Sequence, residues 1–368
     1  MEGRRFVGID LAKRTYEACA LGTGDYRERW NGRTDECGRS RLAARLLAGD
    51  VVAMEAGVTT FETARTIVTL RPDVRVVILN PGKLAVIYAS MKKTDREDAF
   101  KLAWLVQAFP EAYLPTVPLP SMEELQMRRL SKAQVFLKQE RTRLINHLHA
   151  LFVSDGITSM SKRLLATGKS RRMAVKRLTP LHETLASQIL SVIDEVEVRL
   201  SEIGDLIKGM LEGHPDEATI LLSIPGVGPM TAAAFLAYIG DGSRFANASQ
   251  VSNFAGLVPR IDSSGETTRY GHITRSGNSI IRRAAVQAAW AAIRSYAGGV
   301  FRETFERIKA RRGSSIAIVA IARRIVELMY SLLKSGELYR YGSEEDRLRK
   351  LRRYKIELVG TGGLDATT

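Results

Sequence analysis

Short apolar stretches alternate with amphipathic helical patterns along the first hundred residues of the chain. Each stretch of strand type is apolar enough to be buried on both faces, and each helical pattern repeats with a period near 3.6 residues. A chain that alternates strands and helices folds into a layered α/β domain, which we expect over residues 1–108. The predicted elements are strands at 4–10, 15–22, 49–55 and 74–81 and helices at 59–70 and from 95 onward.

A proline-rich linker at 109–120 separates this domain from two long helical patterns. Leucine recurs every seven residues from Leu130 to Leu151, and apolar residues alternate steps of four and three from Ile189 to Met210. These spacings are typical of coiled-coil seams. We expect a coiled-coil helical region over 121–212, as an antiparallel hairpin or as an intermolecular coiled coil.

From residue 215 the pattern changes to shorter, glycine-punctuated helices, which predicts a mainly helical C-terminal domain over 215–336. Its segment 224–237 resembles a helix–hairpin–helix element. There, Gly226 and Gly228 would let backbone N–H groups approach a phosphate at the start of a helix. A plain glycine turn between core helices is the alternative. The remaining residues, 337–368, form a basic tail, expected to be partly disordered.

The charge of the chain indicates its class of partner. Its 368 residues include 55 Lys and Arg against 40 Asp and Glu, which gives a net charge of +15 and a pI near 9.9. This surplus favours a polyanionic partner, of which nucleic acid is the commonest, over a generic basic protein. No apolar run has the length of a bilayer span and no signal peptide is found, so we expect no membrane partner. The two cysteines form no zinc motif and suggest the reduced cytoplasm.

One segment concentrates this charge. Residues 162–177 contain seven basic residues in sixteen and join the two long helices. Contact with a phosphate backbone and a merely solvated basic loop are equally consistent with the pattern. Lys169, Arg171 and Arg172 are the candidate nucleic-acid contacts.

Four carboxylates stand at special places in the α/β domain. Asp10 and Glu55 end predicted strands, and Asp95 and Asp98 stand three residues apart at a predicted helix start. Acids are common at helix N-termini for reasons of capping and dipole alone. In a ribonuclease-H-like fold, however, neighbouring strand ends bring the first two together, and the other two share one helix face. Four such oxygen ligands suit Mg²⁺, for which Mn²⁺ may substitute, and their co-occurrence favours a metal site.

These motifs together identify a resemblance. The segments "VGIDLAK", "AMEA", "KTDREDA", "IPGVGPMTAAAFLAYIGD", "FAGLVPR", "SSG" and "ITRSGN" occur in this order between Phe6 and Gly336. The chain thus resembles the DEDD transposases of insertion-sequence family one hundred ten, relatives of the Piv-type DNA invertases. The pairing of "KTDREDA" with "GLVPR" and "SG" is its most specific part.

The resemblance implies a fold and an activity. The N-terminal domain would be RNase H/RuvC-like, with the four acids as Mg²⁺ ligands, and the C-terminal transposase domain would carry a nucleophilic serine, here Ser264. Family members build composite sites from different subunits, which implies a homo-oligomer, a dimer that becomes a tetramer when synapsed. They use a structured guide RNA, encoded by the element, to pair with donor and target DNA. The expected location is the bacterial cytoplasm, at the nucleoid.

The chemistry of the residues is consistent with this. A serine alkoxide that attacks a phosphodiester forms a phosphoserine linkage and conserves the bond energy for rejoining. Ser263 is the obvious rival nucleophile, and Ser276 is a third serine that we interpret as part of a glycine turn and helix start. Nearby arginines are candidate phosphate ligands or a solvated basic face: Arg260, Arg269 and Arg275.

Four functions are suggested by parts of the sequence. The leading hypothesis is a recombinase that breaks and rejoins DNA through a serine intermediate. The runner-up is a hydrolytic RuvC-like nuclease of the junction-resolvase type, which needs the four acids but neither Ser264 nor the domain at 220–330. A sugar or acid kinase is suggested by "GID", which also opens actin-like ATPase folds, but the further phosphate and adenosine loops are missing from the sequence. A catalytically dead DNA-binding protein is disfavoured by the intact acids and Ser264.

Overall fold

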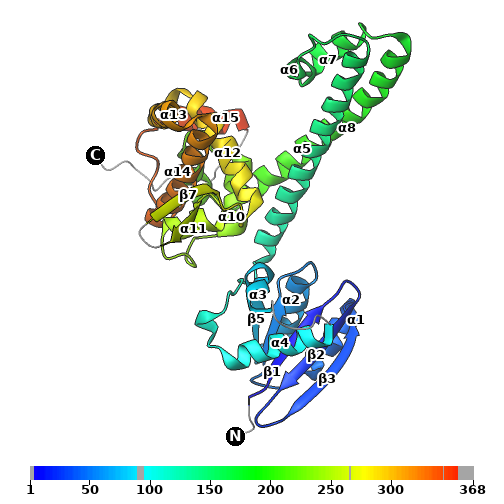
Figure 1. The fold of residues 1–368 in the computed structure, drawn as a ribbon, viewed down its shortest axis with the longest axis vertical. Helices are drawn as coiled ribbons and strands as arrows, with labels where there is room; N and C mark the ends of the chain where they lie inside the picture. The colour runs from blue at the N-terminus through cyan, green and yellow to red at the C-terminus, as the bar shows by residue number, and fades with distance from the viewer. Residues whose placement is uncertain (1–3, 89–94, 265–266, 343, 355–368) are drawn as a thin grey trace. The chain divides into compact units, whose positions relative to one another are not determined.

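The computed structural model describes residues 4–88, 95–264, 267–342 and 344–354 (Figure 1). Its internal contacts divide the chain into an N-terminal part, Met1–Ser121, and a C-terminal part, Met122–Thr368. The first part is a mixed α/β sheet domain and the second is mostly helical, as the patterning predicts.

The N-terminal part is built on a five-stranded sheet with the order β3-β2-β1-β4-β5. The first three strands are antiparallel neighbours, whereas β4 and β5 run parallel to β1. The strands are β1 (Phe6–Leu11), β2 (Thr15–Leu21), β3 (Arg27–Arg33), β4 (Val51–Glu55) and β5 (Arg75–Leu79), and the helices are α1 (Glu36–Arg45), α2 (Thr60–Leu70), α3 (Pro81–Tyr88) and α4 (Asp95–Ala108).

Helices cover both faces of this sheet. On one face, Val7 and Ile9 of β1 and their neighbours on β4 pack against α1 and α2. On the other face, Val51 and Ala53 of β4 pack against α4. Figure 1 shows α4 lying across the sheet. Since alternate residues of a strand point to opposite faces, this division assigns every strand side chain to a face.

A long helical hairpin opens the C-terminal part. Its two helices, α5 (Met122–Ser154) and α8 (Pro180–Glu212), pack against each other in antiparallel directions (Figure 1). The short helices α6 (Lys162–Leu165) and α7 (Gly168–Val175) join them at the tip. Ile193 is fully buried in a core shared with Leu148 and Phe152 of the facing helix. The predicted apolar stripe is therefore buried, at this point, within one chain.

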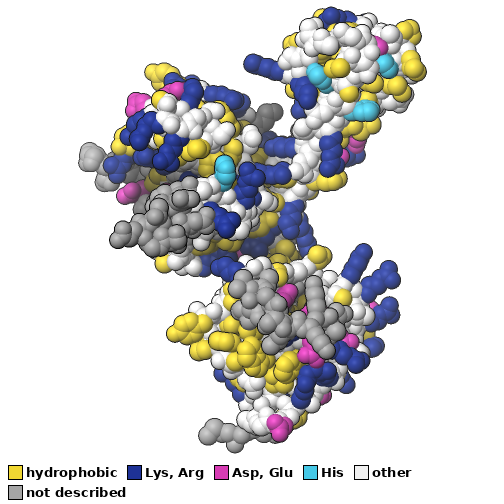
Figure 2. Space-filling view, viewed as in Figure 1, with side chains coloured by type: hydrophobic (Ala, Val, Ile, Leu, Met, Phe, Trp, Pro, Cys, Tyr) yellow, Lys and Arg dark blue, Asp and Glu magenta, His cyan; other side chains and the backbone are white. Residues whose placement is uncertain are grey.

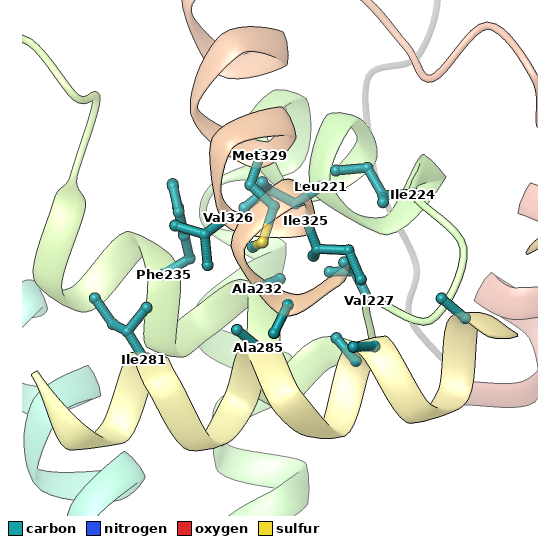
Figure 3. Packing of buried hydrophobic residues seen from close by; sticks show 14 of the residues in the cluster. Leu221, Ile224, Val227, Ala232, Phe235, Ile281, Ala285, Ile325, Val326 and Met329 are labelled. Atoms are coloured by element: carbon teal, nitrogen blue, oxygen red, sulfur yellow. The ribbon is translucent and has the colours of Figure 1, made fainter. Parts of the chain in front are cut away.

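The rest of the C-terminal part is a helical body around a large apolar core. Figure 3 shows residues of four helices converging there, among them Leu221, Phe235, Ala285 and Val326. The elements are α9 (Pro215–Ser223), α10 (Pro229–Ile239), α11 (Ala248–Phe254), β6 (Pro259–Ser264), β7 (Thr267–Ile273), α12 (Ser279–Arg294), α13 (Gly299–Arg312), α14 (Ser314–Ser335) and α15 (Glu344–Tyr354).

Local sequence signals set the ends of several helices. The side chain of Asp35 accepts a hydrogen bond from the backbone N–H of Gly38 and caps α1. Asn278 caps α12 by accepting from the N–H groups of Ile280 and Ile281. Gly336 ends α14 in the left-handed conformation, with φ 71°. Within the described ranges, no helix combines the length and the apolar character needed to cross a membrane.

Candidate active site

Two strands of the N-terminal sheet end side by side, and each ends in an acid. Ile9 of β1 lies opposite Met54 of the parallel strand β4, so Asp10 and Glu55 are the next residues along the same register. Alternation places both on the face that α4 covers, because Ile9 and Met54 belong to the core on the opposite face. The two carboxylates predicted from the sequence therefore share one edge and one face of the sheet.

Helix α4 reaches this edge because Gly8 lets it approach closely. A Cβ atom at Gly8 would lie 2.0 Å from the carbonyl oxygen of Ala99 and 2.4 Å from the nitrogen of Ala103. Only a glycine leaves room for a helix backbone at this distance. This close contact holds the first turns of α4 against β1 at Gly8, which stands two residues before Asp10 on that strand.

The first turn of α4 carries the other two predicted acids. Asp95 is its first residue, and the side chain of Asp95 lies outside the described residues. Asp98 follows one turn later and is 24 % exposed. Its Oδ1 accepts a hydrogen bond of 2.8 Å from Nζ of Lys101, whose side chain is 4 % exposed.

The donor set at this edge has the chemistry of a hard-cation site. Carboxylate oxygens are the ligands that Mg²⁺ and Mn²⁺ prefer, and sheet register and helix packing bring three of them to one edge. Among the described side chains, no group of three His, Cys, Asp or Glu residues is close enough to hold a metal ion on its own. The residues are of the type that binds a divalent cation, and Asp95 is the fourth acid predicted for the set.

The sequence pattern did not single out one further acid at this edge. Glu17 of β2 lies directly opposite Asp10 in the antiparallel pair, so both side chains are on the same face. Its Oε1 accepts a hydrogen bond of 3.3 Å from Asn31. The hairpin register between β1 and β2 is the signal that could have identified it.

The serine predicted as the nucleophile lies at the end of a two-stranded ribbon. Strands β6 and β7 pair only with each other, and Ser264, the last residue of β6, pairs with Thr267. The sequence predicted no strands here. The side chains of Ser264, of its rival Ser263 and of Arg269 lie outside the described residues. The backbone places both serines in the last two positions of the strand.

Basic side chains gather at the base of this ribbon. Arg260 and Arg275, the candidate phosphate ligands, are exposed. Arg282 was not predicted as a site residue. Burial lowers the pKa of Arg282, and the charges of Arg275 and Arg283 lower it further. Arg275 also has a positive φ of 52°, the only non-glycine residue of the described chain that does. Like charges crowded in this way are a candidate phosphate site.

The two glycines of the helix–hairpin–helix segment face protein in this structure. Gly226 has φ 81°, and a Cβ there would lie 2.2 Å from the carbonyl oxygen of Ala288 on α12. A Cβ at Gly228 would lie 3.1 Å from the hydroxyl of Tyr354 on α15. A glycine turn that packs between helices accounts for both glycines, and the phosphate contact through their backbone N–H groups stays a prediction.

A lysine of α15 holds that helix against the turn. The Nζ of Lys350 donates to the carbonyl oxygens of Leu222, Ile224 and Val227 at 2.6, 2.7 and 2.9 Å. Its burial lowers the pKa of Lys350 to about 8. The basic tail thus begins with a helix that caps the C-terminal end of α9.

The structure corrects one of the three basic residues predicted to contact nucleic acid at the hairpin tip. Arg171 is 1 % exposed, and its guanidinium donates hydrogen bonds of 2.7 to 2.9 Å to Glu197 and Asp194 of α8. It is buried because α7 packs against α8, and no phosphate can reach it there. Lys169 is exposed, and Arg172 is 65 % exposed with one bond to Asp194.

Figure 2 shows Lys and Arg side chains over the visible face of both parts, with fewer Asp and Glu. The amino-acid sequence matches models of known protein families. The family model of DEDD transposases of the IS110 type matches residues 7–154, and the model described as "Transposase IS116/IS110/IS902 family" matches residues 218–306. Together the two models cover more than half of the chain.

Individual relatives extend over nearly the whole chain. A protein of Pseudomonas aeruginosa, named probable family 20 transposase, is 26% identical over 91% of this chain and 98% of its own length. The transposase for insertion sequence element IS1111A of Coxiella burnetii is 26% identical over 93% of each chain. The IS110 protein of Streptomyces coelicolor is 32% identical over 42% of this chain and 37% of its own.

Proposed function

The chain belongs to the IS110 family of DEDD transposases, and from that premise we propose that it moves an insertion sequence through a phosphoserine intermediate. An insertion-sequence transposase of this family acts on DNA, which it cuts and rejoins. The proposal assigns the cutting chemistry to Ser264 and to the acidic edge of the N-terminal sheet.

One observation carries the assignment of the acids. Asp10 and Glu55 end adjacent parallel strands on the face that α4 covers, and Asp98 lies on the first turn of that helix. The strand order and directions, with three antiparallel strands followed by two parallel ones, support a RuvC-like domain. A kinase would need phosphate and adenosine loops, which the sequence does not contain.

Asp10, Glu55, Asp95 and Asp98 would hold Mg²⁺ or Mn²⁺. Such a cation lowers the pKa of an attacking hydroxyl and offsets the negative charge of the transition state. The chain's own contribution is to keep the acids in position. The Gly8 contact fixes α4 on β1 and Lys101 fixes one oxygen of Asp98.

The proposed serine step balances as a transesterification. The Oγ of Ser264 loses its proton and forms a bond to phosphorus, while the bond from phosphorus to one neighbouring deoxyribose oxygen breaks. That oxygen takes up a proton and becomes a free hydroxyl end. The other DNA end stays attached to the protein as a phosphodiester of serine. A hydroxyl of another strand reverses the step on rejoining, so no external energy source is needed.

We propose a structured guide RNA and a homo-oligomer as further partners. Support for a polyanionic partner comes from the net charge of +15 and from the arginines at the base of the β6–β7 ribbon. Support for self-association comes from apolar residues of α8 that remain exposed in the single chain. They are Leu181, Leu185, Val192 and Leu206, each 45 to 68% exposed.

The test is a denaturing gel of end-labelled DNA trapped during reaction with excess Mn²⁺. Wild type should give a covalent protein–DNA adduct, and Ser264→Ala should abolish both adduct and strand exchange. Ser263→Ala is the matched control, one residue earlier on the same strand, and should retain the adduct.

The same gel separates the runner-up function. A metal-activated water would leave two free DNA ends in wild type, without adduct, and Ser264→Ala would cut normally. That outcome would refute the serine intermediate and favour a hydrolytic nuclease.

A further inference from the structure

A buried lysine lies beside the acidic edge of the N-terminal sheet. Lys101 is 3% exposed, although it belongs to a class of residue that is almost never fully buried without a partner. It stands one helical turn before Leu105, which packs against Ala53 of β4. Ala53 is two residues before Glu55 on the same face of the sheet.

The direction of the helix brings the ammonium group of Lys101 toward the acids. Side chains in a helix lean toward its N-terminus, and the N-terminus of α4 lies over the strand ends. The bond of 2.8 Å from Nζ of Lys101 to Oδ1 of Asp98 fixes that direction. The positive charge therefore lies toward the end of α4 that carries Asp98.

Two physical effects follow from a cation at this place. Carboxylates packed together repel one another, and a fixed ammonium offsets that repulsion when no metal is bound. The same ammonium repels a divalent ion. A unit positive charge about 6 Å from a divalent ion would weaken binding of that ion roughly tenfold even at the dielectric constant of water.

We propose that Lys101 is an internal counter-ion of the acidic site. It orients Asp98 through one oxygen, stabilises the metal-free arrangement of the acids, and lowers the affinity of the site for its divalent cation. Lys101 is thus a positioning residue that acts through Asp98. The inference rests on the proposed function only in taking the four acids as a cation site.

The experiment measures thermal stability of the full-length protein during Mn²⁺ and Mg²⁺ titrations, without DNA and without turnover. Lys101→Met keeps the apolar stem and removes the charge. Its melting temperature should fall without metal, and its half-saturating Mn²⁺ concentration should fall about tenfold. Lys101→Arg keeps the charge and should titrate as wild type does. Arg96→Met removes an exposed positive charge from the first turn of the same helix and should leave the half-saturating concentration unchanged.

The outcomes separate the inference from the proposed function. Asp10→Asn is expected to show no shift of its melting temperature with metal. If the wild type shows no shift either, the cation site itself is refuted. Two other outcomes would refute the role of Lys101 alone, provided that the wild type does shift. One is a half-saturating Mn²⁺ concentration that is unchanged in Lys101→Met. The other is a change in Arg96→Met equal to that in Lys101→Met. If Lys101→Met is unfolded without metal, excess Mn²⁺ should restore its circular dichroism, and failure to do so would also overturn the inference.

Discussion

The buried Arg171 at the hairpin tip should stabilise α7, whereas its neighbour Arg172 should not. We consider Arg171→Met, which keeps the apolar stem and removes the guanidinium. The change eliminates three hydrogen bonds to Glu197 and Asp194, all between 2.7 and 2.9 Å. Arg172→Met is the matched control, since it removes one bond from a side chain that is 65 % exposed.

The size of the destabilisation depends on which charges lose a partner when the guanidinium of Arg171 is removed. Removing one partner of a fully buried pair costs about 3–5 kcal/mol. Here the two acids are 35 and 37% exposed and keep Arg141 and Arg172 as partners. Water and these arginines recover part of the loss, so we expect about 2–3 kcal/mol for Arg171→Met. For the exposed pair of Arg172 we expect less than about 1 kcal/mol.

The pH dependence has a definite sign. The bond from Arg171 is the main cause that lowers the pKa of Glu197, and Arg172 and then Arg171 lower the pKa of Asp194. A depressed folded pKa gives stability that is present above the unfolded values, 4.5 and 3.8, and is lost as the pH falls through the folded values. The difference between wild type and Arg171→Met should therefore be constant from about pH 5 to 7 and shrink in stronger acid.

Hydrogen exchange read by mass spectrometry suits this test, because it reports the local opening of α7 separately from the rest of the chain. A loss of 2–3 kcal/mol corresponds to exchange roughly 30- to 150-fold faster in α7. Arg172→Met should exchange nearly as wild type does, while binding DNA more weakly. Unchanged α7 protection in Arg171→Met, or equal losses in both variants, would refute the reasoning.

Three further outcomes are expected. Gly8→Ala should destabilise the N-terminal part by about 1–3 kcal/mol or more in thermal melts, because the added Cβ meets the backbone of α4. Gly204→Ala is the control, since its Cβ would lie on an open helix surface, and it should be neutral or stabilising in the same melts. Asp98→Asn should abolish strand exchange but melt at a higher temperature than Asp98→Ala, because only alanine leaves the ammonium of Lys101 without an acceptor at position 98. Equal melting temperatures of the two variants would contradict the pairing of Lys101 with Asp98. Lys350→Met should release α15 and speed its amide exchange, since three carbonyl groups lose their donor; unchanged protection of α15 would contradict its anchoring role.

The sequence predicted the elements whose patterns are local and strong. Strands such as β1 and β4 are short apolar runs, and the long helices repeat an apolar stripe, so both were identified. β3 was missed because its sequence, RERWNGR, is that of a polar edge strand in which one residue, Trp30, is buried. The ribbon of β6 and β7 was missed because polar and glycine residues conceal its alternation.

The residues of the candidate site likewise fall into those that the sequence could identify and those that only the fold reveals. Acids at the ends of strands and helices are visible in a sequence, so Asp10, Glu55 and Asp98 could be named before the register was known. Partnerships across the fold leave no local signal. Nothing near Arg171 distinguishes it from Arg172, and only the docking of α7 on α8 buries the first and exposes the second. Glu17 and Lys101 likewise acquire their place from strand register and helix packing.

The length of the helical hairpin can be expressed as a length of DNA. Each of its two long helices has 33 residues, which corresponds to about 50 Å at 1.5 Å per residue. B-form DNA rises about 3.4 Å per base pair, so this length matches roughly 15 base pairs. At one end of the hairpin, Met127 and Leu211 are buried in the core of the helical body, while at the other Lys169 is exposed. A DNA duplex lying along the hairpin would therefore be contacted over about one and a half turns of the double helix. Lengthening both protein helices by one heptad would extend the contacted DNA by about three base pairs.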